Sequence, residues 1–127
     1  MSEKLYKPLL IDSVKATADL DKQIFVGFDG GVCGEGEKAY GVCDVETDSG
    51  QLAPVAVLGI LLVVAGGEIT AGSPVTSDEN GYAVVATAPS VTTESSTTTL
   101  ATGDEINGYA LDDASASGEV IRILRGI

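Results

Sequence analysis

Short apolar segments alternate with glycine-rich and acidic turns along most of this chain, a pattern typical of short β-strands joined by tight turns. The segments that carry the pattern span residues 24–28, 39–45, 55–64, 82–87, 108–111 and 120–124. No apolar stripe with a helical period extends beyond about ten residues. We therefore expect an all-β fold, a compact small β-barrel or sandwich built from short hairpins.

One pattern occurs twice. Residues 41–59 read GVCDVETDSGQLAPVAVLG and residues 108–126 read GYALDDASASGEVIRILRG. In each copy the outer glycines are 18 residues apart, and the inner glycines, Gly50 and Gly118, differ by one place. A duplicated strand–turn–strand unit with a one-residue insertion in one turn accounts for this spacing. The sequence thus predicts two equivalent hairpins.

The longest apolar run, Val55 to Ala65, contains Gly59. Glycine within a strand often marks a bulge or a tight bend, so we expect two apolar stretches that pivot about this residue. Residues 55–64 and 120–124 are expected to line one core. The run is eleven residues long, whereas a membrane helix needs about 20, so no membrane partner is predicted.

Residues 1–12 have no regular apolar alternation, and Pro8 disfavours a helix before it. We interpret them as an extended N-terminal arm that packs little against the single β domain formed by residues 13–127. Exposed apolar side chains need a surface that buries them. The predicted partner-binding residues of the arm are therefore Leu5, Tyr6, Pro8, Leu9 and Leu10.

Residues 87–103 differ in composition from the rest of the chain, because ten of these seventeen residues are Ser or Thr. The segment carries no core pattern. Two interpretations stay open: an ordinary surface loop, and an insertion that projects outward and contacts a partner.

The formal net charge is −12, and a negative field of this size repels phosphate backbones, so nucleic acid is not an expected partner. The acidity serves solubility or matches a basic partner surface. The N-terminus lacks the apolar stretch of a signal peptide, which predicts synthesis in the cytoplasm. Cys33 and Cys43 are too few for a disulfide framework, and two buried thiols are favoured over one disulfide.

Candidate chemistry is scarce. The chain contains no His, which excludes a Ser-His-Asp or Cys-His arrangement and removes the commonest metal ligand. The phosphate-binding GxxxxGK[ST] loop is missing, and the acidic pairs lie in turn-like stretches without calcium-loop spacing. We predict no catalytic, cofactor-binding or metal-binding residues and no enzymatic activity.

Two motifs are similar to those of a known family. Gly67, Ile69, Gly72, Val75, Ser77, Asp78 and Gly81 carry a glycine-rich hairpin motif that includes [IV]-x-x-G-x-x-V-x-[ST]-D-x-x-G, and Gly108, Ala110, Leu111, Asp112 and Ala114 carry a G-x-A-L-[DE]-x-A motif. In this order they resemble the capsid cement, or head decoration, proteins of tailed bacteriophages. The resemblance covers about residues 14–127 except the Ser/Thr-rich segment.

This resemblance implies a non-enzymatic structural virion protein that binds the outer surface of the assembled capsid and stabilises the lattice of the major capsid protein. It also implies a homotrimer on the shell. The first alternative is a carbohydrate- or ligand-binding β module displayed on a virion, although the four Tyr residues are scattered. The second alternative is a hydrolase with paired acids, for which so small a chain offers little room.

Overall fold

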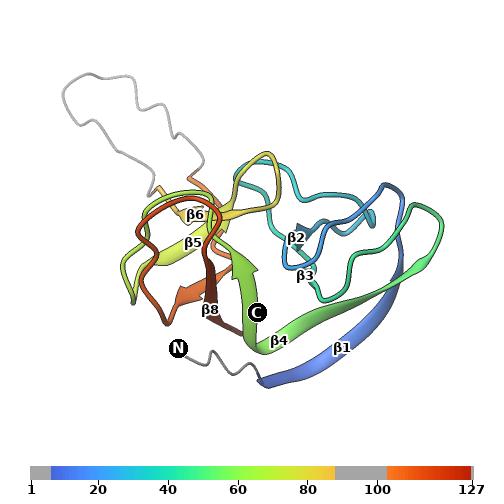
Figure 1. Cartoon of the computed structure of the whole chain (residues 1–127), viewed down its shortest axis with the longest axis horizontal. Coiled ribbons are helices and arrows are strands. Elements are labelled where there is room, and N and C mark those ends of the chain that lie inside the picture. Colours follow the sequence, from blue (N-terminus) through green and yellow to red (C-terminus); the bar gives the residue numbers. More distant parts are fainter. Residues whose placement is uncertain (1–6, 88–102, 127) are drawn as a thin grey trace, which may run out of the picture.

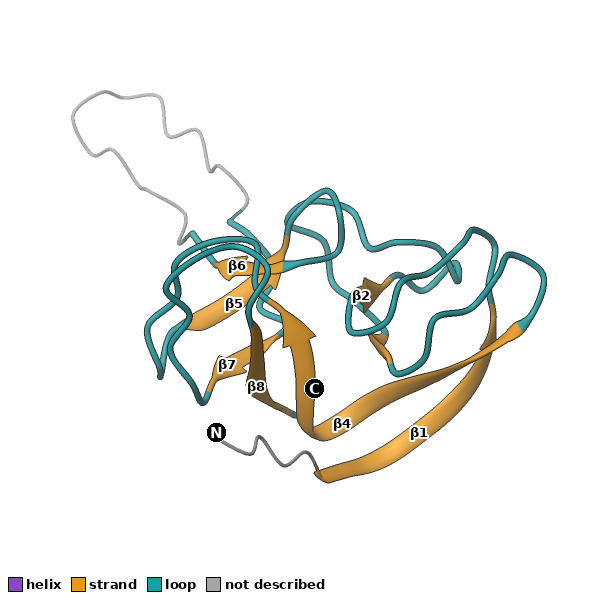
Figure 2. Cartoon of the chain, viewed as in Figure 1, coloured by secondary structure: helices purple, strands orange, loops and turns teal. Residues whose placement is uncertain are grey.

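The structure, a computed structural model, describes residues 7–87 and 103–126, and all regular elements in these residues are β-strands (Figure 2). The strands are β1 (Lys7–Lys15), β2 (Phe25–Val26), β3 (Gly41–Cys43), β4 (Leu52–Val64), β5 (Pro74–Ser77), β6 (Ala83–Val85), β7 (Gly108–Ala110) and β8 (Val120–Arg125). The prediction of an all-β fold is confirmed.

The eight strands form one sheet that bends round on itself (Figure 1). The strand order is β2-β3-β4-β8-β7-β5-β6, and β1 pairs with β4 outside this path. Just after β4, Ala65 forms a parallel bridge to Ala83 of β6, and the Gly66 N–H donates to the Ala83 carbonyl at 2.8 Å. Strands β4, β8, β7, β5 and β6 are thereby closed into a small barrel.

The duplicated pattern forms two equivalent hairpins, as predicted. In the first, β3 pairs antiparallel with β4, and Val42 lies opposite Ala56. In the second, β7 pairs antiparallel with β8, and Tyr109 lies opposite Leu124. Val42 and Tyr109 each follow the glycine that opens their copy, so the two copies correspond strand for strand.

The core differs from the prediction, because it consists of two clusters rather than one. The barrel encloses the larger cluster, which includes Leu61, Val63, Ile121 and Ile123. The smaller cluster includes Val55 and Val57 from the first half of β4, together with residues of the loop before β2 such as Leu20. The bend of β4 near its middle (Figure 1) separates the two halves of the strand. One strand can therefore line both clusters.

Gly59, near the middle of β4, has φ +112°, a conformation that L side chains rarely adopt. It confirms the expected pivot. β1 pairs with β4 from Leu52 to Ile60 and β3 pairs with Val55 and Ala56, whereas β8 pairs with β4 from Gly59 to Val64.

Two buried polar side chains attach the connection before β3 to the barrel. Asn107 donates through Nδ2 to the Glu37 carbonyl and accepts from the Ala39 N–H, both at 2.8 Å. Arg125, 3% exposed, donates to the carbonyls of Ala39, Tyr40 and Val57. Burial lowers the pKa of this guanidinium. Backbone carbonyls that would otherwise lie unpaired in the interior are thereby satisfied.

Cys33 and Cys43 are both buried and free, as the favoured interpretation predicted. The Cys33 thiol donates to the carbonyl of Glu37, and the Cys43 thiol donates to that of Val45. Burial raises the pKa of both thiols. Residues 88–102, most of the Ser/Thr-rich segment, lie outside the described residues.

Candidate functional site

The predicted partner-binding residues Pro8, Leu9 and Leu10 lie on β1, whereas Leu5 and Tyr6 lie outside the described residues. β1 runs along the outside of β4 (Figure 1) and pairs, within the described residues, only with that strand. Its register extends from Lys7 opposite Ile60 to Lys15 opposite Leu52. The prediction that residues 1–12 pack little against their own domain is therefore wrong for the backbone from Lys7 onward.

The boundary placed after residue 12 also falls inside a strand, since β1 continues without interruption to Lys15. Neither side of β1 is fully covered, and most of its residues are exposed. This explains why its sequence lacks apolar alternation: a strand with no buried face needs no period of two.

The side chains of β1 form an exposed apolar stretch. Leu9 is 82% exposed, and Leu10 and Ile11 are each 47% exposed. Ile11 was not among the predicted residues; its place directly after two leucines was the signal that could have added it. The outer edge of β1 also leaves backbone groups unpaired by any described strand, and such an edge is a template for another chain.

The pairing of β1 with β4 is irregular where the apolar side chains lie. The register shifts between Pro8 and Leu10 and again between Leu10 and Ile11. A shift of this kind leaves an extra residue and re-aims side chains next to it. Leu9, at the first shift, has no partner on β4 and is the most exposed large apolar side chain described.

A side-chain hydrogen bond joins β1 to the body of the domain. The Tyr40 hydroxyl donates to Oδ2 of Asp12 at 2.6 Å, and this bond raises the pKa of Tyr40. The Tyr40 ring also packs against Phe28, with ring centroids 5.5 Å apart at 49°. Phe28 is 67% exposed. The two rings are tilted toward each other and do not form a flat stacking platform.

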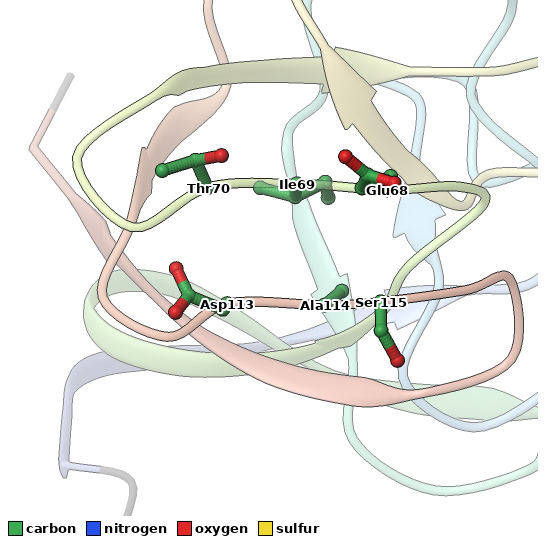
Figure 3. A pocket seen from close by; sticks show the side chains of 6 residues that line it. All are labelled: Glu68, Ile69, Thr70, Asp113, Ala114 and Ser115. Atoms are coloured by element: carbon green, nitrogen blue, oxygen red, sulfur yellow. The ribbon is translucent and has the colours of Figure 1, made fainter.

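A separate shallow hollow of about 290 Å³ lies between the loops at residues 68–70 and 113–115 (Figure 3). Ile69 and Ala114 bridge the two loops through their backbones and are buried. Asp113 accepts a hydrogen bond from the Ala71 N–H at 2.7 Å, so this carboxylate supports the loop. The six lining side chains include no Cys, Lys, Arg or His.

Over residues 7–87 and 103–126, no three His, Cys, Asp or Glu side chains gather closely enough to hold a metal ion. In the same part of the chain, no helix is long and apolar enough to cross a membrane. The features that stand out are an exposed apolar edge strand on an all-β domain and a strongly negative charge. Such features are typical of a domain that contacts another protein.

The comparisons with known proteins identify its class. The phage cement protein family matches residues 7–125, and the chain belongs to this family. The chain therefore has a capsid-associated structural role. No curated protein matches the sequence.

The fold also resembles that of a solved structure, the N base of the head fibre gp8.5 of bacteriophage phi29. The TM-score is 0.66 at 20% sequence identity, over 92% of this chain and 93% of the other. At this identity the likeness concerns the fold alone.

Proposed function

We propose that this protein binds the outer surface of an assembled phage capsid, contacts the major capsid protein and stabilises the lattice. Its family membership over residues 7–125 is the observation that carries the proposal. No catalytic step is required. A ligand that binds the assembled lattice and not the separate subunits stabilises assembly by RT ln(1 + [L]/Kd), about 2.7 kcal/mol per site when [L] is 100 Kd.

β1 is the proposed contact with the shell or with a neighbouring subunit. Burial of Leu9 and Leu10 would stabilise the complex by about 25 cal/mol for each Å² of apolar surface removed from water. The free edge of the strand offers backbone groups for strand addition, which combines main-chain hydrogen bonds with side-chain pockets. Leu5 and Tyr6 continue the same apolar stretch toward the N-terminus and belong to the proposal.

We further propose that the protein acts as a homotrimer on the capsid exterior, bound to no nucleic acid and free of enzymatic activity. Its net charge of −12 favours binding to a basic shell surface and repels the phosphate backbone of nucleic acid. Trimers match three-fold positions of a symmetric shell, where each subunit makes the same contacts. Synthesis in the host cytoplasm precedes binding to the shell.

Sedimentation with purified shells that lack the protein tests this function. The protein should pellet with the shells to a fixed number of copies and stay in solution without them. A panel of glycans should give no binding. Glycan binding without shell binding would instead favour the carbohydrate-binding alternative, for which the exposed Phe28, packed on the half-buried Tyr40, is the nearest aromatic surface.

A further inference from the structure

The charges of this protein are divided between its strands and its loops. Of the acidic residues in the described chain, Asp12 is the one that lies in a strand. The basic residues within strands are Lys7, Lys15, Arg122 and Arg125. The loops therefore carry almost all of the negative charge, and the outer surfaces of strands β4, β7 and β8 carry no carboxylate.

These three strands share an outward apolar surface. Along β4 and β8, inward-pointing and outward-pointing side chains alternate. The inward-pointing ones are fully buried: Leu61, Val63, Ile121 and Ile123. Their neighbours face outward on the pleated sheet. We name this surface the apolar face and define it by Ile60, Leu62, Tyr109, Leu111 and Leu124.

The side chains of the apolar face are in register. Ile60 lies opposite Leu124, and Leu124 lies opposite Tyr109, so one row crosses all three strands. Directly opposite side chains on adjacent strands are close enough to touch. Leu124, at the centre of the row, is 50% exposed, and Tyr109 is 49% exposed. Ile60 and Leu62 are half-buried, so the exposed part of this continuous apolar surface is formed by Tyr109, Leu111 and Leu124.

The neighbouring row adds no net charge. Leu62 lies opposite Arg122, and the Leu111 N–H donates to the Arg122 carbonyl at 2.8 Å. The Arg122 guanidinium binds Asp112 through two hydrogen bonds of 3.0 and 3.1 Å. This pair neutralises its own charges, and the one other charged residue described in register with the apolar face is Lys7, opposite Ile60. The apolar face therefore carries no net negative charge on a protein of charge −12.

We propose that the apolar face is where copies of this chain meet about a three-fold axis, with Leu124 nearest the axis. The inference rests on the homotrimer proposed above and assigns its contact. A shell protein could supply basic residues against the acidic loops, so it needs no neutral surface. A second copy brings the same −12 charge, and it can approach closely only through a surface without net negative charge, such as this one, where the Asp112 carboxylate is paired with Arg122. Apolar burial there offsets the remaining repulsion.

The test is the mass of the protein in high salt, measured by light scattering for wild type, Leu124→Glu and Leu52→Glu. Leu52 is a matched control, because it is an apolar residue of the same strand as Ile60, is 68% exposed and lies outside the apolar face. We expect wild type and Leu52→Glu to have about three times the 12.9 kDa chain mass. Leu124→Glu should fall to the mass of one chain with an unchanged circular dichroism spectrum.

If the wild-type protein is a single chain in solution, the subunit contact is tested instead by oxidative cross-linking of protein bound to shells. Leu124→Cys should form disulfide-linked pairs, with one thiol in three left over at the axis, and Leu52→Cys should form none. Absence of a cross-link at residue 124 both in solution and on shells overturns the proposal. A Leu124→Glu protein that keeps its trimeric mass also overturns the proposal. If that variant in addition loses binding to shells, the apolar face contacts the shell and not a second copy.

The same Leu124→Cys variant also shows whether the apolar face is covered by the chain's own N-terminus rather than by a second copy or the shell. If the Leu124→Cys thiol reacts only after deletion of residues 2–6, that segment covers the apolar face, and the proposal is wrong. The mass measurement involves no shells. A wild type that trimerises through Leu124 and yet ignores shells would therefore refute the proposed function while supporting the trimer contact.

Discussion

Gly59 of β4 lies so close to Lys7 of β1 that a Cβ on Gly59 would fall 2.5 Å from the Lys7 carbonyl oxygen. The same Cβ would fall 2.8 Å from the Leu9 nitrogen. The edge strand that carries the proposed contact residues can therefore approach the sheet only because this position has no side chain. The bend of β4 and the placement of β1 depend on one glycine.

Gly59→Ala should destabilise the protein, because φ of +112° strains an L residue by about 1–3 kcal/mol and the new methyl group collides with the β1 backbone. The matched control is Gly50→Ala. Gly50 also has a positive φ, +90°, but a Cβ at this position would meet no heavy atom within 4 Å, so the substitution introduces strain alone. Urea unfolding should show the larger loss for Gly59→Ala, and equal losses would refute the close approach of β1.

Arg125→Met should lower the free energy of unfolding by about 2–4 kcal/mol, because the substitution leaves the buried carbonyls of Ala39, Tyr40 and Val57 without donors. The methionine keeps most of the apolar volume. Arg122→Met is the control: Arg122 is paired at the surface and should contribute much less. Thermal unfolding of both variants tests the difference, and a neutral Arg125→Met would show that the carbonyls find other partners.

Stability should be nearly constant between pH 6 and 8, because the chain has no His, and should fall as the pH rises above about 9. The pKa values of Cys33, Cys43 and Tyr40 are all raised in the folded protein. The unfolded chain then loses these protons at lower pH than the folded protein. Each group therefore stabilises the fold fully at pH values below its pKa in the unfolded chain, and this stabilisation is lost as the pH rises through its pKa in the folded protein. Denaturant titrations across this range measure the slope.

Tyr40→Phe should make the alkaline fall in stability shallower, since it removes one of the three groups. A profile unchanged by this substitution would argue against the hydrogen bond to Asp12. The two thiols give an independent check. Neither should react with a thiol reagent in the native protein, whereas both should react after unfolding.

Leu9→Asp should weaken binding to shells, because it places a charge at the most exposed apolar position of β1 and leaves the buried core untouched. We expect at least a tenfold rise in Kd, equivalent to about 1.4 kcal/mol. Leu52→Asp, another exposed leucine on the neighbouring strand β4, should bind normally. Sedimentation with shells at several protein concentrations provides both constants; equal weakening would mean that charge alone, rather than the β1 surface, determines binding.

The sequence predicted those parts of the fold that depend on turns and alternation. The repeated glycine spacing identified both hairpins, and Gly59 marked the bend in β4. Strand ends were less accurate: the segment expected at 24–28 forms a strand only at Phe25–Val26, because the turn that follows begins earlier than the apolar run ends. β1 was missed as a strand because its side chains are exposed on both sides.

Arg125 and the apolar face were also missed, although the alternation of β8 contained both. Ile121 and Ile123 point inward, and the same period of two places Leu124 outward and Arg125 inward. Arginine is rarely buried unless it is paired, so the residue type alone predicts an exposed position for Arg125. Its burial depends on three carbonyls from distant segments, and no local pattern reveals that arrangement.

The heat stability of purified shells, measured with and without saturating protein, tests the central claim most directly. If the protein cements the lattice, the temperature at which shells disrupt should rise with occupancy and stop rising when every site is filled. Leu9→Asp should shift this curve to higher protein concentrations. Shells that bind a full complement of protein and yet disrupt at the same temperature would contradict the account, because the protein would then decorate the capsid without stabilising it.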